Sequence, residues 1–117
     1  MTTQVQEKQY TLEEYFDFEY TSKVRHQFFD GKIVPMTYTS KSHGRIVNNL
    51  SRLLGNCLID TAFEVYTGDR MLYIPACNQV YYPDLIILPE ETETFEYKEK
   101  MEADLHPTVV MEVLSDS

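Results

Sequence analysis

Two short apolar tracts, each carrying one acidic residue, constrain the fold of this chain more than any other feature. Residues 80–88 contain Asp84 and residues 107–114 contain Glu112, and both tracts are rich in β-branched and aliphatic residues. This composition is typical of buried strands. An ionised carboxylate in such a strand is costly unless it is paired or binds a cation. Two carboxylates that meet repel each other, and a divalent metal ion relieves that repulsion. We therefore predict a metal site formed by Asp84 and Glu112.

Each acidic residue also has a purely structural interpretation. Asp84 follows Pro83, and a Pro-Asp pair commonly begins a strand after a turn. Glu112 can point to solvent if the sheet is buried on one face only. This second interpretation is the weaker one, because Val110 and Leu114 share the face of Glu112 and would be exposed with it.

The overall composition indicates one globular domain. The chain has 117 residues, 43% of them hydrophobic, with nine Tyr and six Phe, which favours a packed core over disorder. There is no apolar run long enough for a transmembrane helix and no signal peptide. We therefore expect a cytoplasmic protein without a membrane partner, in which Cys57 and Cys77 are buried free thiols, with a disulfide or a zinc site as the lesser alternative.

The net charge of −9 disfavours DNA as a partner, because non-specific binding to nucleic acids requires a basic surface. It does not exclude a nuclease, since bound metal ions offset acidic groups locally.

Local signals predict the first three elements. A capping box at Thr11–Glu14 begins a short helix that runs to about residue 18, with Leu12, Tyr15, Phe16 and Phe18 facing inward. Asp30-Gly31 separates strand-like residues 24–29 from 32–36, which predicts an antiparallel hairpin with a type I′ turn.

The remaining pattern predicts an α+β fold. Apolar residues spaced by three and four predict a long helix at about 42–59, capped by Ser40 or Ser42. Strands are expected at 63–66 and 70–74 and in the two acid-bearing tracts. Residues 89–106 are strongly acidic, and we expect a solvated excursion with a turn of helix near 98–102. The result is a mixed β-sheet with the N-terminal helix, the hairpin and the long helix packed on the sheet.

Several motifs together resemble the Uma-type restriction endonuclease family of the PD-(D/E)xK nuclease superfamily. The resemblance covers nearly the whole chain from about residue 10. The matching segments are Tyr10–Tyr15, Arg25 with 28–36, His43 with Ile46, Asn49 and Leu50, Asp69-Arg70, Tyr82-Pro83-Asp84, and 107–115.

This resemblance implies a restriction-endonuclease-like fold and Mg²⁺-dependent hydrolysis of phosphodiester bonds in DNA, with Mn²⁺ as a substitute. It implies that Asp84 and Glu112 are catalytic metal ligands and that the backbone carbonyl of Val113 is a third ligand. It also implies that His43 faces the site, although an exposed position at the start of the helix is an equal alternative. Asp69 recurs in the family pattern, and turn chemistry is its alternative role.

The chain departs from the family pattern at one functional position. Leu114 stands where the superfamily has a Lys, and in the Uma-type proteins this Lys lies on a helix after the Glu strand. Lys98 and Lys100 match nothing in the pattern. We expect residues 1–9 to be a flexible N-terminus, and residues 10–117 to be one domain that lacks its last helix and strand. Ser115-Asp116-Ser117 is typical of the start of such a helix.

Two functions from different classes follow. The first is a Mg²⁺-dependent DNA endonuclease or an impaired, truncated relative, with a phosphodiesterase acting on another substrate as a lesser variant. The alternative is a non-catalytic interaction or oligomerisation module. An exposed core face would favour a homo-oligomer in either case.

Overall fold

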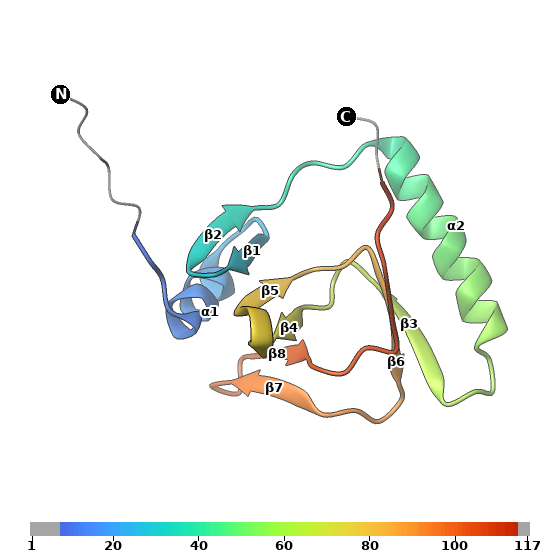
Figure 1. The fold of residues 1–117 in the computed structure, drawn as a ribbon. Coiled ribbons are helices and arrows are strands. Elements are labelled where there is room, and N and C mark those ends of the chain that lie inside the picture. The colour runs from blue at the N-terminus through green and yellow to red at the C-terminus, as the bar shows by residue number, and fades with distance from the viewer. Residues whose placement is uncertain (1–7, 115–117) are drawn as a thin grey trace.

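The computed structural model describes residues 8–114 and shows two sheets with a helix beside each (Figure 1). Six strands form one sheet in the order β2-β1-β5-β4-β8-β7, and three form the other in the order β3-β6-β9. In chain order the elements are α1 (Leu12–Thr21), β1 (His26–Phe29), β2 (Lys32–Pro35), α2 (Lys41–Cys57), β3 (Phe63–Thr67), β4 (Leu72–Ile74), a 3-10 helix (Pro75–Cys77), β5 (Gln79–Tyr81), β6 (Leu85–Pro89), β7 (Thr94–Tyr97), β8 (Met101–Asp104) and β9 (Val109–Met111).

The predicted α+β class is confirmed, with the N-terminal helix, the hairpin and the long helix all present. The strands divide between two sheets, where the sequence pattern suggested one. Neither helix within residues 8–114 is long and apolar enough to cross a membrane. Most of the predicted flexible N-terminus, and the helix start predicted at 115–117, lie outside the described residues.

Helix α1 begins at the predicted capping box and continues to Thr21. The Thr11 hydroxyl accepts from the backbone N–H of Glu14 at 3.1 Å, and Glu14 accepts from the backbone N–H of Thr11 at 3.0 Å. The predicted inward position of Phe18 is wrong, because its side chain is 47% exposed. Glu19 is buried instead, since it lies four residues after Tyr15 and three after Phe16 on the same face of the helix.

The hairpin forms as predicted. Asp30 and Gly31 have φ values of 47° and 85°, the positive angles that a type I′ turn requires. Tyr10 donates its N–H to the carbonyl of Gly31 at 2.9 Å, so the chain before α1 lies across the turn. A side chain at Gly31 would collide with Gln9, whose Oε1 lies 2.1 Å from the position of an added Cβ.

The main core lies between α1 and the six-stranded sheet. Tyr15, Phe16, Phe28 and Val80 are fully buried there. A second cluster joins the two sheets and is built from Leu72, Ile86 and Leu88. Helix α2, capped by Ser40, packs beside β3, and none of its residues is fully buried. The apolar stripe of α2 is therefore only half covered.

Two predictions outside the site are corrected by the structure. Residues 89–106 are not a solvated excursion with a helical turn: they contain the hairpin β7–β8, in which Lys98 and Glu99 take φ values of 51° and 57°. This hairpin is stable because Tyr97 stacks on Phe16, with ring centroids 5.1 Å apart. Both cysteines are free thiols as expected, but they are exposed rather than buried.

Candidate active site

Asp84 lies where the chain passes from one sheet to the other. The sequence predicted one continuous strand over 80–88, but the strand is interrupted at residues 82–84. β5 belongs to the six-stranded sheet and β6 to the three-stranded sheet, so Tyr82 and Pro83 carry the chain between them. Both are buried, and Asp84 is half-buried. The carboxylate is 21% exposed and lies at the junction of the sheets rather than inside a continuous strand.

The register of the three-stranded sheet brings Glu112 beside Asp84. β6 and β9 are antiparallel, with Leu85 opposite Met111. One step further along this register, Asp84 faces Glu112. The N–H of Val113 donates to Oδ2 of Asp84 at 2.8 Å, which ties the end of β9 to the start of β6. The two carboxylates predicted to meet are thus neighbours.

Helix α2 supplies the third side chain. Ser40 caps the helix and accepts from the N–H of His43 at 3.1 Å. This cap fixes the first turn of α2 so that Nε2 of His43 lies 3.0 Å from Oδ2 of Asp84. The side chain of His43 is only 10% exposed, so the exposed alternative considered from the sequence does not apply.

The electrostatics of the site suit a cation. Partial burial, and after it the negative charge of Asp84, raise the pKa of Glu112 from 4.5 to about 7. Oδ2 of Asp84 accepts from both His43 and Val113, and within residues 8–114 Oδ1 has no hydrogen-bond donor. Oδ1 is therefore the oxygen of Asp84 without a donor in the described residues, and the Glu112 carboxylate interacts with the side chain and the backbone of Asp84.

The donor set fits one class of metal. In the described part of the chain, no group of three or more His, Cys, Asp or Glu side chains is arranged to hold an ion. Zinc sites usually require such a set. Mg²⁺ binds through one or two carboxylates and keeps several waters, so Asp84 and Glu112 fit Mg²⁺.

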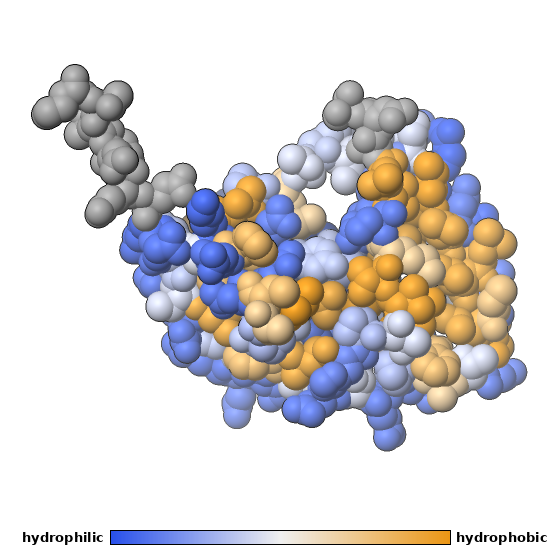
Figure 2. Space-filling view, in the orientation of Figure 1, coloured by the Kyte–Doolittle hydropathy of each residue, from blue (hydrophilic) through white to orange (hydrophobic). Residues whose placement is uncertain are grey.

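A cleft of about 630 Å³ opens above Asp84. Figure 2 shows the molecule hollowed between the part formed by α1, β1 and β2 and the helix α2. The lining combines acidic and basic side chains with hydroxyl and amide groups. It includes Lys23, Arg25, Thr37, His43, Asn48, Asp69, Tyr82 and Asp84.

Asp69 joins the two walls of this cleft. It forms an ion pair with Arg25, which also donates to the carbonyl of Gly68 at 3.0 Å. The Arg25 guanidinium lies 5.4 Å from the centre of the Tyr82 ring. Asp69 thus holds Arg25 against Tyr82, which lies two residues before Asp84. Neither interpretation of Asp69 from the sequence identified this role.

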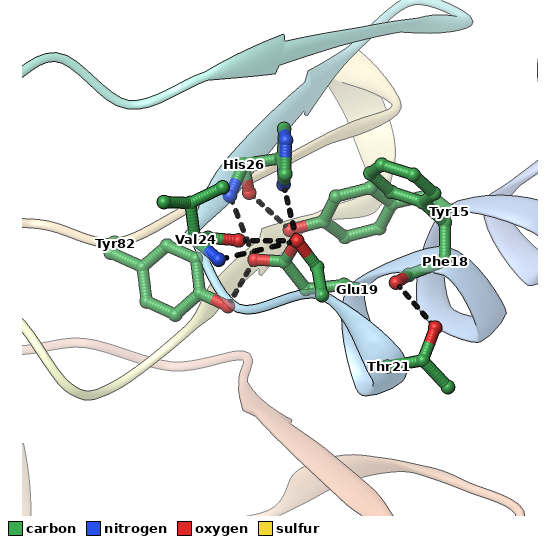
Figure 3. A network of polar contacts seen from close by, with 8 residues as sticks. Tyr15, Phe18, Glu19, Thr21, Val24, His26 and Tyr82 are labelled. Atoms are coloured by element: carbon green, nitrogen blue, oxygen red, sulfur yellow. Dashed lines mark hydrogen bonds and ion pairs between the residues drawn. The ribbon is translucent and has the colours of Figure 1, made fainter.

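A buried polar network also supports the Asp84 segment (Figure 3). Glu19 accepts from the backbone N–H of His26 at 2.8 Å and from the hydroxyl of Tyr82 at 2.7 Å, and its other oxygen lies 2.9 Å from Nδ1 of His26. Tyr15 donates to the carbonyl of His26 at 2.6 Å. Glu19 was not predicted as a functional residue from the sequence, although its position on the apolar stripe of α1 was a usable signal.

The fold and the site together define an α+β nuclease-like domain with paired carboxylates at the edge of a sheet. The structure is similar to the crystal structure of a putative nuclease belonging to DUF820 from Anabaena variabilis ATCC 29413. The TM-score is 0.68 at 14% identity, over 90% of this chain and 58% of that chain. The family model for Uma2, putative restriction endonuclease, matches residues 12–117. The chain belongs to the Uma2 family.

Two relatives come from Synechocystis sp. (strain ATCC 27184 / PCC 6803 / Kazusa). The uncharacterized protein sll1609 is 34% identical over 107 residues, which are 92% of this chain and 59% of that protein. The uncharacterized protein slr1290 is 30% identical over 105 residues, which are 90% of this chain and 53% of that protein. The chain thus spans somewhat more than half the length of each relative.

Proposed function

We propose that this protein is a Mg²⁺-dependent endonuclease that hydrolyses phosphodiester bonds in DNA, with low turnover. The observation that carries the proposal is the β6–β9 register, which sets Asp84, a lining residue of the cleft, opposite Glu112. The membership in the Uma2 family supports the reaction class.

The residues of the chain have distinct parts in this proposal. Asp84 and Glu112 would hold the metal, together with the backbone carbonyl of Val113. When bound, Mg²⁺ polarises a phosphoryl oxygen and lowers the pKa of a coordinated water. His43 and the N–H of Val113 both bond Oδ2 of Asp84, so they fix the rotation of this carboxylate and leave Oδ1 facing away from them.

The low turnover is proposed from position 114 alone, the place of the Lys in the wider superfamily; the Uma-type proteins carry this Lys on a later helix. The superfamily places a Lys there that stabilises charge on the attacking water or the phosphoryl group. Leu114 carries no charge. Preorganised positive charge of this kind contributes two or more orders of magnitude to turnover in other enzymes, about 3 kcal/mol of barrier.

Two measurements test the proposal. Isothermal titration of Mg²⁺ and Mn²⁺ is expected to show binding to the wild type that is lost in Asp84→Asn. A plasmid-nicking assay with Mn²⁺ is expected to show weak nicking that is absent in Glu112→Gln. Exposed Glu91→Gln serves as a control with the same charge change away from the site. Metal binding or nicking that survives both site substitutions would refute the assignment.

A second function, an oligomerisation module, is favoured by the apolar side of α2 and the chain after β9. Ile46, Leu53 and Leu114 are 46%, 62% and 92% exposed. We propose that a second copy of this chain covers this face in a homo-oligomer. Sedimentation of Leu53→Gln is expected to show a shift toward monomer, with Val34→Gln on β2 as the control. Wild type that sediments as a monomer at high concentration would exclude this function.

A further inference from the structure

The positive charge of this acidic protein is concentrated in one segment. Residues 20–59 contain six of the ten basic residues and only one of the 19 acidic residues. The segment therefore has a net charge of +5 within a chain of −9. It includes the connection from α1 to β1, the hairpin β1–β2 and the whole of α2. Its connection before β1, its connection after β2 and the first half of α2 line the cleft beside Asp84.

The basic residues outside this segment are neutralised within the fold or lie over a ring. Lys8 pairs with Glu14 at 3.7 Å, and Lys98 pairs with Asp17 at 3.5 Å. Arg70 forms ion pairs with Glu102 and Asp104 at 2.7 and 2.5 Å. The Lys100 ammonium lies over the Tyr20 ring, 5.0 Å from its centre.

Four cations of the segment behave differently. Lys23, Lys41, Arg45 and Arg52 have no ion-pair partner anywhere in residues 8–114. All four side chains are exposed. Arg25 differs from them because Asp69 and Tyr82 already engage its guanidinium.

Three of these cations form a stripe along α2. Spacings of four and seven residues separate Lys41, Arg45 and Arg52, which places them on one side of the helix. At 1.5 Å per residue the stripe is about 16 Å long, the length of about five base pairs of duplex DNA at 3.4 Å each. Gly44 and Asn48 lie beside the stripe and line the cleft.

The fourth cation lies across the cleft from the stripe. Lys23 belongs to the connection between α1 and β1 and lines the opposite wall. Lys23 and Asp84 thus line the cleft itself, and the stripe lies on α2 next to the cleft-lining residues Gly44 and Asn48. An extended polyanion is the ligand that such an arrangement accommodates, because its flanking phosphates meet cations while one phosphate approaches the carboxylates.

A purely solvated helix face explains the stripe less well. Exposed helix faces usually mix Glu and Lys in pairs four residues apart, which stabilise the helix. Helix α2 contains no acidic residue. Lys41 is also the first residue of the helix, where the helix dipole disfavours positive charge. The arrangement is unfavourable for the free protein and becomes favourable when an anion binds.

We propose that Lys23 and the α2 stripe of Lys41, Arg45 and Arg52 are positioning residues that bind the phosphate backbone of duplex DNA on either side of the Asp84 cleft. The proposal rests on the proposed nuclease function for the identity of the ligand. It assigns to these four residues the binding of phosphates, which carries no sequence information by itself.

The test is fluorescence anisotropy of a labelled 30-base-pair duplex, measured in EDTA over a range of salt concentrations so that no cleavage occurs. Wild type is expected to bind with an affinity that falls steeply with salt. Lys23→Gln, Arg45→Gln and Arg52→Gln are each expected to weaken binding about tenfold at 50 mM salt and to lower the salt slope by about one. Lys100→Gln, which removes a cation on the β7–β8 turn, is the matched control and is expected to bind as wild type does.

A second variant tests the site without deleting a cation. No atom lies within 4 Å of an added Cβ at Gly44, so Gly44→Glu introduces a carboxylate between stripe and cleft without a collision. It is expected to weaken duplex binding at least as much as Arg45→Gln, while circular dichroism shows an intact fold. Equal affinity of this variant and the wild type would overturn the proposal.

The result is separable from that of the nuclease assignment. Asp84→Asn in EDTA is expected to bind the duplex at least as tightly as the wild type, because one repulsive charge is removed. If metal binding fails while the stripe variants lose DNA affinity, the nuclease assignment is wrong and the DNA surface stands. If wild type shows no salt-dependent DNA binding, or if Lys100→Gln weakens it as much as Lys23→Gln, the DNA surface is wrong whatever the metal assay shows.

Discussion

Glu112→Gln is expected to stabilise the metal-free protein at alkaline pH. Partial burial, and next the charge of Asp84, raise the pKa of Glu112 from 4.5 to about 7. At 1.36 kcal/mol per pKa unit this difference corresponds to about 3 kcal/mol of destabilisation once Glu112 is ionised. The residue is more than one third exposed, so solvent screening reduces the expected effect to about 1 kcal/mol.

The sign of the pH dependence follows from the raised pKa. Below pH 4.5 Glu112 is protonated in both the folded and the unfolded chain, so it has no effect on stability. As the pH rises from 4.5 to about 7, the unfolded chain ionises first, and the free energy of unfolding of the wild type falls. Glutamine at position 112 does not ionise, so the variant keeps its free energy of unfolding as the pH rises. The difference in stability between the variant and the wild type therefore reaches its full size above pH 7.

Thermal unfolding in EDTA at pH 8 and pH 4 measures this effect. Glu112→Gln is expected to unfold about 5 °C above the wild type at pH 8 and at the same temperature at pH 4. Glu91→Gln makes the same charge change at an exposed position and is expected to leave both temperatures unchanged. An equal or lower unfolding temperature for Glu112→Gln at pH 8, or the same gain at pH 4, would refute the raised pKa of Glu112.

Adding Mg²⁺ is expected to reverse the order of stability. A ligand at ten times its Kd stabilises the folded state by about 1.4 kcal/mol. Wild type is expected to gain this amount, whereas Glu112→Gln, which lacks one of the two carboxylates, is expected to gain much less. Equal stabilisation of both proteins would show that Glu112 is not a ligand.

Three further substitutions test other parts of the structure. Gly44→Ala is expected to stabilise α2 by about 0.5–1 kcal/mol in urea unfolding, because nothing lies near the added methyl group; a loss of stability would contradict the open position. Glu19→Ala is expected to lower the free energy of unfolding by about 3 kcal/mol in urea unfolding, because three buried donors lose their acceptor. Tyr82→Phe removes only one of these hydrogen bonds and is expected to cost about 1 kcal/mol. Equal costs would show that Glu19 is not the shared acceptor of the network. Asp104→Asn is expected to cost about 3 kcal/mol in the same assay because it breaks a buried ion pair with Arg70, and a cost near zero would exclude that role.

Features that depend on a few neighbouring residues were predictable from the sequence. The capping box at Thr11–Glu14, the Asp30-Gly31 turn and the start of α2 after Ser40 all formed as predicted. Each of these is decided by hydrogen bonds or dihedral angles within one turn of the chain. The β7–β8 hairpin was missed because its acidic composition hides the alternation of Phe95, Tyr97, Met101 and Ala103, and because Arg70 supplies compensating charge from a distant segment.

The sequence by itself determined that Asp84 and Glu112 required an explanation, because isolated carboxylates in apolar tracts are costly. The tertiary structure decided how they meet. It interrupts the strand at residues 82–84, sets Asp84 opposite Glu112 through the β6–β9 register and brings His43 to Asp84 from another element. These contacts join residues 28 and 41 positions apart, and no local pattern specifies such pairs.

The charge of the protein is likewise determined in part by the sequence and in part by the fold. The sequence fixes the sum at −9, and this sum counted against DNA as a partner. The electrostatic potential at a site depends on where each charge lies, because interactions between exposed charges are screened within about 10 Å. Only the fold shows that the unpaired Lys23 lines the cleft and that Lys41, Arg45 and Arg52 lie on the helix that forms part of its lining, while most acidic residues lie elsewhere on the molecule.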